Sequence, residues 1–280
     1  MNNESLRLSF EFFPPKTDVG KEKLAVVREE LAAFNPDFFS VTYGAGGSTR
    51  DNTKNLVKQF NALGTPVAPH LSFGGDDEAT IKELIAEYQA AGINRIVALR
   101  GDMPSGVGGS YQLVYANELV AFIRQHFGDA FELEVAAYPE IHPQAKTYDD
   151  DIRFLKGKFD AGANSAITQY FYNPDAYFYF VDQCQKAGID KPIYPGIMPI
   201  VNVRNLMRFS DNCGAEIPRW LRKRLEAYEF DTESLKSFGV DLVTDLCETL
   251  LDNEAPGLHF YTMNQTQPTA QIAKNLGWGQ

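Results

Sequence analysis

The amino-acid sequence predicts an α/β fold, namely a single (β/α)8 barrel of the TIM type. Short apolar runs rich in β-branched and aromatic residues alternate with longer segments of helical periodicity along the whole chain. Eight such runs occur at intervals of about 30 residues, whereas an open doubly wound sheet usually ends earlier. No linker rich in Ser, Gly or Pro interrupts the 280 residues, so we expect one barrel domain, residues 1–280.

The predicted strands are the short apolar runs. The first run stops at Pro14 and Pro15, which lack the N–H that a strand ladder needs. In chain order the strands are LRLSFEFF (6–13), FFSVTY (38–43), VAPHL (67–71), RIVAL (95–99), ELEVAAY (132–138), SAITQ (165–169), IYPGI (193–197) and GLHFY (257–261).

Amphipathic segments between these runs predict the helices. They cover residues 20–33, 51–63, 77–91, 117–127, 149–161, 174–187 and 232–251. The acidic run Asp149 to Asp151 suits a helix start, where carboxylates cap free backbone amides. The interval before the last strand is about twice the others, and residues 204–209 and 218–228 also look helical. We therefore expect an insertion of extra helices between strands 7 and 8.

Composition and charge limit the classes of partner. The formal net charge of −11 disfavours binding to nucleic acid or to an anionic membrane surface, which leaves small molecules as the expected ligands. No run of apolar residues is long enough to span a bilayer, and the N-terminus lacks a signal-peptide pattern. The three cysteines and four histidines show no metal or disulfide spacing. A cytoplasmic protein without a metal site is the expectation.

Polar side chains concentrate at the ends of the predicted strands. In a (β/α)8 barrel the chemistry lies at the C-terminal ends of the strands, where the βα loops converge. Seven of the eight exits carry polar groups, and they favour Tyr, His, Arg, Asp and Gln over the Lys, Glu and Ser of an ordinary wet loop. They are Glu11; Thr42 and Tyr43; His70; Arg100 to Asp102; Tyr138 to His142; Thr168 to Tyr170; and Tyr261 to Asn264. This pattern predicts a pocket for a flat polar ligand.

Glu11 is unusual because it lies among three phenylalanines in the stretch SFEFFPP. Alternation along a strand places Phe10 and Phe12 on one face, and Ser9, Glu11 and Phe13 on the other. One interpretation is a glutamate paired with a buried Arg or Lys. The other is a general acid, whose pKa is raised by burial so that the carboxyl stays protonated near neutrality.

A series of motifs resembles the methylenetetrahydrofolate reductases. They are SFEFFPP, VTYGA, APHLSF, IVALRGD, AAYPE-x-HP, DAGAN-x-AITQYF, PGIMPI and FYTMN, in order over nearly the whole chain. The resemblance corresponds to the catalytic domain of that family, in its short bacterial form. It implies a cytoplasmic FAD enzyme that reduces 5,10-methylenetetrahydrofolate to 5-methyltetrahydrofolate with NADH or NADPH, in two hydride transfers through flavin N5, and so supplies methyl groups for methionine synthesis. Bacterial relatives suggest NADH and a homo-oligomer.

The resemblance also implies roles for particular residues. Glu11 would protonate the folate nitrogen N10, and Asp102 would act electrostatically near the flavin pyrimidine edge and the pterin. The residues expected around FAD are Tyr43, Ala45, His70, Arg100, Gly101, Asp102, Tyr115, Ala116, Tyr138, His142, Ala145, Asp151 and Lys158. The residues expected to contact nicotinamide or folate are Thr42, Asp102, Gln169, Asn205, Phe209 and Gln265, with Phe209 stacked on whichever substrate is bound.

Four positions depart from some bacterial relatives. Phe154 and Gly157 stand where those relatives carry Asn and Arg beside the cofactor, and Asn205 and Gln265 stand where they offer Gln and Arg to the folate. Two other functions share parts of this pattern. A pterin-binding methyl transferase could use a similar folate pocket without a flavin, and a folate- or flavin-binding protein could keep the barrel without turnover.

Overall fold

The computed structural model describes residues 6–43, 47–73, 76–100, 115–228 and 230–279. Nine strand segments form one parallel sheet in the order β7-β6-β5-β4-β3-β2-β1-β9-β8. Their bounds are β1 (Arg7–Phe12), β2 (Phe38–Val41), β3 (Val67–Leu71), β4 (Arg95–Ala98), β5 (Glu132–Ala137), β6 (Ser165–Thr168), β7 (Ile193–Tyr194), β8 (Gly196–Ile197) and β9 (Gly257–Tyr261).

The sheet closes through residues 193–197, the predicted seventh strand. β7 pairs with β6, and β8 pairs with β9, so the two short segments act as one strand interrupted at Pro195. Proline has no N–H to donate, but its carbonyl oxygen accepts from the N–H of His259 at 3.0 Å. At Gly196 an added Cβ would lie 2.1 Å from the carbonyl oxygen of Thr168, so only glycine allows this close approach. The predicted eight-stranded barrel is confirmed.

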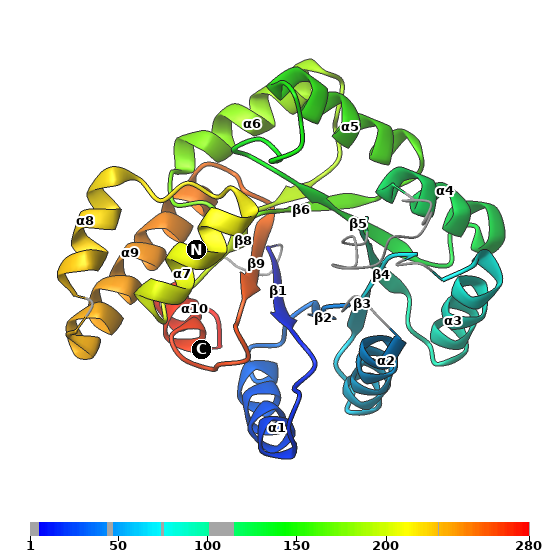
Figure 1. The fold of residues 1–280 in the computed structure, drawn as a ribbon, viewed down its shortest axis with the longest axis horizontal. Coiled ribbons are helices and arrows are strands. Elements are labelled where there is room, and N and C mark those ends of the chain that lie inside the picture. Colours follow the sequence, from blue (N-terminus) through cyan, green and yellow to red (C-terminus); the bar gives the residue numbers. More distant parts are fainter. Residues whose placement is uncertain (1–5, 44–46, 74–75, 101–114, 229, 280) are drawn as a thin grey trace, which may run out of the picture.

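Helices surround the strands, as Figure 1 shows. They are α1 (Asp18–Ala32), α2 (Gly47–Ala62), α3 (Glu78–Ala90), α4 (Ala116–Phe127), α5 (Tyr148–Asp160), α6 (Pro174–Lys186), α7 (Val203–Cys213), α8 (Arg219–Ala227), α9 (Thr232–Asp252) and α10 (Thr269–Asn275). The predicted helical ranges all fall on helices, including the two extra ranges, which coincide with α7 and α8. The short α10 was not predicted.

Side-chain caps explain several helix starts. Thr17 accepts from the N–H of Gly20, Asp77 from that of Thr80, and Thr147 from that of Asp150. Thr147, rather than the acidic run after it, therefore caps α5. None of the helices in the described part of the chain combines the length and apolar character needed to cross a bilayer.

The apolar core has two layers separated by the sheet. Outside the barrel, Phe10 and Phe12 are fully buried, and their rings lie 6.1 and 5.0 Å from that of Phe39. Inside the barrel, a smaller cluster consists of Phe38, Ala68, Val97 and Ile167. The predicted alternation along β1 is thus confirmed, because its phenylalanines face the helices and its polar residues face inward.

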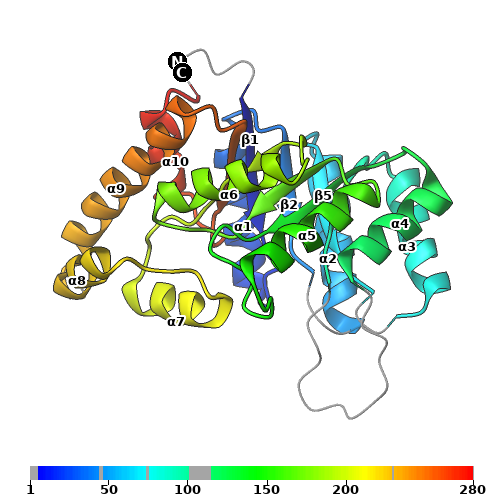
Figure 2. The ribbon, with the colours of Figure 1, turned by 90° about the horizontal axis from the view of Figure 1, so that it is seen from above.

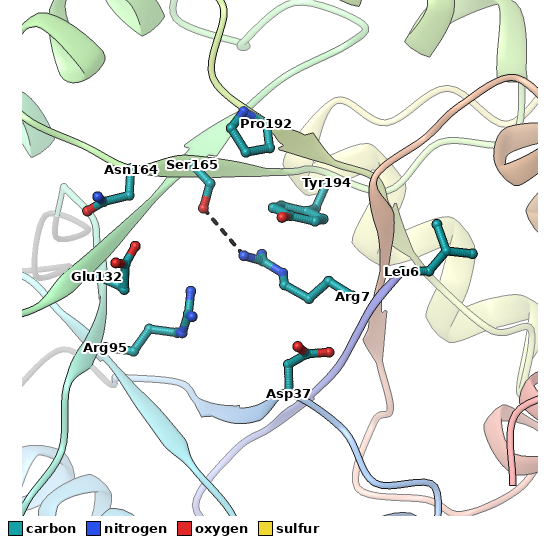
Figure 3. Close-up of a pocket in the computed structure, with 9 residues that line it drawn as sticks. All are labelled: Leu6, Arg7, Asp37, Arg95, Glu132, Asn164, Ser165, Pro192 and Tyr194. Carbon is teal, nitrogen blue, oxygen red and sulfur yellow. Dashed lines mark hydrogen bonds between the residues drawn. The ribbon is translucent and has the colours of Figure 1, made fainter. Parts of the chain in front are cut away.

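A polar plug of Arg7, Arg95, Glu134, Ser165 and Tyr194 fills the barrel at the N-terminal ends of the strands. The Arg7 guanidinium makes two hydrogen bonds to Glu134, at 2.8 and 3.1 Å, and lies 3.2 Å from the centre of the Tyr194 ring. Arg95 and Ser165 also bind Glu134. Figure 3 shows Arg7 reaching across a cavity of about 340 Å³ beside this plug. Since its charged groups already bind one another, we assign the plug to stability rather than to ligand binding.

Candidate active site

Residues that follow β9 hold Glu11 in place at the end of β1. The hydroxyl of Thr262 donates to the main-chain oxygen of Glu11 at 2.6 Å. Asn264 accepts from the N–H of Phe13 at 3.0 Å and donates to the carbonyl oxygen of Phe13 at 2.8 Å. The main chain of the first strand exit is therefore fixed by the C-terminal part of the sequence.

The carboxylate of Glu11 lies inside the barrel between two imidazoles. Its Oε2 is 3.3 Å from Nε2 of His70 on β3 and 3.5 Å from Nε2 of His259 on β9. The other ring nitrogen of His259, Nδ1, lies 2.8 Å from the hydroxyl of Ser9. His259 is fully buried, whereas the side chain of Glu11 is 18% exposed. Glu11 therefore reaches the mouth of the barrel, and its partners hold it from within.

The two imidazoles determine the charge of Glu11. Burial raises the pKa of this carboxyl and is the largest single contribution, but His70 and His259 together outweigh it and lower the pKa to about 2. The expectation that the carboxyl stays protonated near neutrality is therefore wrong for the protein alone. The physical reason is strand alternation, which turns Phe10 and Phe12 away and leaves polar groups facing Glu11.

His70 and His259 do not contribute equally to the lowered pKa of Glu11. Burial lowers the pKa of His259, which favours its neutral form, and the ring lies between the Ser9 hydroxyl at Nδ1 and the Glu11 carboxylate, which is 3.5 Å from Nε2. Among the contributions that lower the pKa of Glu11, the Coulomb interaction with His70 is the largest, and the contributions of His259 are smaller.

Sequence reasoning did not select His259, because this residue lies in the middle of the last strand and not at its exit. The available signal was alternation within GLHFY. Leu258 and Phe260 share the face toward the helices, so the histidine between them faces the barrel interior, level with Ser9 in the pairing of β9 with β1.

Replacing His70 with Gln should raise the pKa of Glu11 toward its ordinary value, because the largest lowering contribution disappears while a hydrogen-bond donor remains. Infrared difference spectra of glutamate-labelled protein, with Glu11→Gln as the reference for assignment, would follow the carboxylate band through the acid range. His126→Gln is the matched control, because His126 contacts Phe122 and not Glu11. Equal titration curves for the two histidine variants would contradict the assignment.

A second group of polar residues lies beyond the exits of β4 and β5, and we call Arg100, Tyr138, His142, Asp151 and Lys158 the β4–β5 exit cluster. Asp151 accepts from the main-chain N–H of His142 at 2.8 Å, and the rings of Tyr138 and His142 lie 4.5 Å apart. Arg100 donates to Gln144 at 2.5 Å. The structure therefore brings together five residues that the sequence places on two strand exits and one helix.

Lys158 is the desolvated cation of the β4–β5 exit cluster. Its ammonium donates to the carbonyl oxygen of Ala136 at 2.7 Å. Burial lowers the pKa of Lys158 to about 8, although Asp151 acts in the opposite direction. Among the residues that the structure describes, no carboxylate lies within ion-pair distance of this ammonium. Its charge is therefore available to an anionic ligand.

Comparison with known proteins places the chain in a family. The family model described as methylenetetrahydrofolate reductase matches residues 1–277. The chain belongs to the methylenetetrahydrofolate reductase family. It is 38% identical over 273 residues to the 5,10-methylenetetrahydrofolate reductase of Escherichia coli (strain K12), covering 97% of this chain and 91% of that protein. It is 36% identical to methylenetetrahydrofolate reductase (NADH) 1 of Arabidopsis thaliana, covering 96% of this chain and 48% of the plant protein.

A solved structure supports the fold of this methylenetetrahydrofolate reductase family member. It is an uncharacterized protein from Clostridium thermocellum that binds two copies of 5-methyl-5,6,7,8-tetrahydrofolic acid, and it has a TM-score of 0.65. The match covers 98% of this chain and 95% of the other, at 18% identity. At that identity the likeness shows the barrel fold alone.

The remaining residues expected from the methylenetetrahydrofolate reductase resemblance lie at strand exits and on neighbouring helices. Thr42 and Tyr43 follow β2, and the Tyr43 hydroxyl donates to Asp76 at 3.4 Å. Gln169 follows β6 and accepts from the N–H of Tyr170 at 3.0 Å. Tyr115 and Ala116 begin α4, Ala145 lies between β5 and α5, Asn205 and Phe209 lie on α7, and Gln265 follows β9. Ala45, Gly101 and Asp102 lie outside the described residues.

Two of the departures from bacterial relatives lie on α5. The Phe154 ring is 55% exposed, and the Arg153 guanidinium lies 5.3 Å from its centre. At Gly157 an added Cβ would meet no atom within 4 Å, so this position has open space for a longer side chain. Lys158 follows directly and donates to the carbonyl oxygen of Ala136 within the β4–β5 exit cluster.

Proposed function

We propose that this protein is an FAD-dependent reductase that converts 5,10-methylenetetrahydrofolate to 5-methyltetrahydrofolate with NADH or NADPH as the reductant. The observation that carries the proposal is the Glu11–His70–His259 group at the barrel mouth of a methylenetetrahydrofolate reductase family member. The product would supply methyl groups for methionine synthesis. We also propose a homo-oligomer in the cytoplasm, which light scattering and cell fractionation would test.

The β4–β5 exit cluster fits the pyrophosphate of FAD. Arg100 and Lys158 are cations at one rim of the barrel, and Lys158 is desolvated without a carboxylate in contact among the described residues. Tyr138, His142 and Asp151 would complete this part of the site, together with the other FAD-binding residues expected from the resemblance, namely Tyr43, Ala45, His70, Gly101, Asp102, Tyr115, Ala116 and Ala145. When bound, FAD would supply the capacity to take up a hydride from one substrate and give it to the other.

Glu11 would hold the proton that the folate nitrogen N10 receives. Because the pKa of Glu11 is lowered to about 2, the proton would come through Glu11 from an adjacent imidazole, or Glu11 would become protonated when folate binds. A ligand over the barrel mouth would exclude water from the exposed part of this side chain, and burial raises its pKa. Thr42, Asp102, Gln169, Asn205, Phe209 and Gln265 would position the nicotinamide and the folate, with Asp102 also acting electrostatically.

An absorbance spectrum of the purified protein tests the proposal directly. We expect flavin bands as isolated or after reconstitution with FAD, loss of the 450 nm region with anaerobic NADH as expected of a reduced flavin, and recovery when methylenetetrahydrofolate is added. Protein that stays colourless with FAD, but transfers a methyl group, would indicate a pterin-binding methyl transferase. A yellow protein whose bands do not respond to NADH or NADPH would indicate a binding protein without turnover.

The affinity for FAD should fall as the pH rises above 8. The pKa of Lys158 is lowered to about 8, so the free protein loses this positive charge above that pH, whereas a bound pyrophosphate favours the ammonium. Binding then takes up a proton, and Kd should rise about fivefold between pH 8 and pH 9. Flavin fluorescence titrations of the apo-protein would measure this. Lys158→Met should bind FAD more weakly at every pH, with no such slope, whereas Lys156→Met, on the exposed face of α5, should behave like the wild type.

A further inference from the structure

The connection after β5 carries two energetically costly features on adjacent residues. Burial raises the pKa of Glu140 to about 7, so the fold disfavours its ionised form and loses stability as the pH rises from 4.5 toward 7. The next residue, Ile141, has a φ of 68°, a left-handed conformation that a β-branched residue rarely adopts. Strain of this kind persists where surrounding contacts enforce it, and it concentrates at functional sites.

The short segment 138–142 contacts both the β4–β5 exit cluster and the connection between α7 and α8. The Oε2 of Glu140 accepts from the main-chain N–H of Glu216, in the connection between α7 and α8, at 2.7 Å. That distance lies within the usual range of an N–H···O hydrogen bond. On either side of this pair of residues, Tyr138 and His142 bring their rings together within the β4–β5 exit cluster. The segment thus links that cluster to the chain that follows α7.

Two further contacts attach the C-terminal end of α7 to the barrel. The hydroxyl of Tyr170, after β6, lies 2.9 Å from that of Ser210. Gly214 ends the helix with a φ of 75°, and an added Cβ there would lie 3.0 Å from the Pro143 ring. Figure 2 shows α7 at the end of the barrel where the strands finish. Phe209 is adjacent to Ser210, so a shift of this end of the helix would move Phe209.

We propose that Glu140 is a positioning residue, which fixes the end of α7 by binding the N–H of Glu216 and so sets how tightly both substrates bind beside Phe209. The proposal rests on the proposed function, in which Phe209 contacts nicotinamide and folate in turn. Glu140 acts through α7. The contact between Tyr170 and Ser210 joins two side chains, whereas Glu140 holds the main chain of the connection that follows α7.

Three variants test this role in the holoenzyme. Glu140→Ala removes the acceptor, and Glu140→Gln keeps an amide oxygen at the same reach. Asp37→Ala is the matched control, because Asp37 also binds a distant main-chain N–H, that of Leu8 at 2.8 Å, but at the opposite end of the barrel. The measurements are KM and kcat for each substrate, FAD affinity, and hydrogen exchange of the amides of α7.

For Glu140→Ala we expect the KM of both substrates to rise about tenfold with kcat changed less than about threefold, and α7 amides to exchange about tenfold faster. Glu140→Gln should restore the wild-type KM values and the wild-type exchange rates of the α7 amides. Asp37→Ala should lower Tm while KM stays unchanged. Unchanged KM values in Glu140→Ala, or an equal loss in kcat for both half-reactions, would overturn the proposal. If the wild type fails to oxidise NADH or NADPH, the proposed function fails instead, and unchanged α7 exchange in Glu140→Ala would still refute the positioning role.

Discussion

Replacement of Glu11 with Gln should lower the rate of methylenetetrahydrofolate reduction by about 100- to 10,000-fold, which is the usual contribution of a general acid. Gln has the shape of the glutamate side chain but cannot deliver a proton to N10. Reduction of the flavin by NADH needs no such proton and should keep its wild-type rate. Anaerobic stopped-flow mixing, first with NADH and then with folate, measures the two half-reactions separately.

Ser9→Ala is the informative companion variant. It leaves the Glu11 carboxyl in place and removes only the hydroxyl that orients His259. Folate reduction should therefore fall far less than in Glu11→Gln, by about tenfold or less, as the loss of one neutral hydrogen bond implies. An equal loss of both half-reactions in Glu11→Gln would show that this residue supports binding or folding, and not proton transfer.

Replacement of Glu134 with Ala should lower the free energy of unfolding by about 3–5 kcal/mol, because breaking a buried ion pair leaves its partners uncompensated. Here the partners are two guanidinium groups, those of Arg7 and Arg95, and Arg7 is only 9% exposed. For a chain of this size we expect Tm to fall by about 10 °C. Urea denaturation at pH 7 and differential scanning calorimetry would measure both quantities.

A surface carboxylate provides the comparison for this second variant. Glu87 also contacts two cations, Lys54 at 2.6 Å and Lys58 at 2.9 Å, but it is 43% exposed. Glu87→Ala should cost no more than about 1 kcal/mol. Similar losses in the two variants would refute the assignment of the plug to stability.

The pH dependence of the Glu134 effect has a definite sign. Burial raises the pKa of this carboxyl, but Arg7 and Arg95 outweigh burial and hold the pKa below its ordinary value. Its stabilising contribution is therefore present above about pH 4.5, the ordinary glutamate range, and is lost as the pH falls through the lowered pKa. The difference between wild type and Glu134→Ala should shrink in that acid range.

Local rules in the sequence predicted the scaffold. The period-two pattern of SFEFF placed Phe10 and Phe12 on one face of the strand and Glu11 on the other, as the structure confirms, and the structure shows that Glu11 is the residue that faces into the barrel. The regular recurrence of apolar runs predicted the eight strand positions, and helical periodicity predicted every helix except α10. These features were accessible because they depend on residues only a few positions apart.

The protonation state of Glu11 could not be predicted from sequence patterns. Whether Glu11 is protonated depends on His70 and His259, which the closed sheet brings within 3.5 Å although they lie far apart in the chain. The sequence indicated a carboxyl among apolar residues, and that indicated a raised pKa. The pKa is lowered instead, because pKa depends on the nearest charges and donors in space.

For Asp151 and Glu140 as well, the sequence indicated the position of the residue, but only the structure showed its contacts. The position of Asp151 in the first turn of α5 was clear from the acidic run, but its bond to the N–H of His142 required the loop after β5 to fold back over the helix. Similarly, Glu140 was identified only as a polar residue at a strand exit, and its contact with Glu216 required α7 to be in place. Sequence by itself determined which residues share a face of a strand and where the strands end, because side-chain alternation and backbone propensity act locally. Tertiary structure alone decided which of those residues meet and what charge they carry, because Coulomb interactions, hydrogen bonds and desolvation depend on distances that only the closed barrel sets.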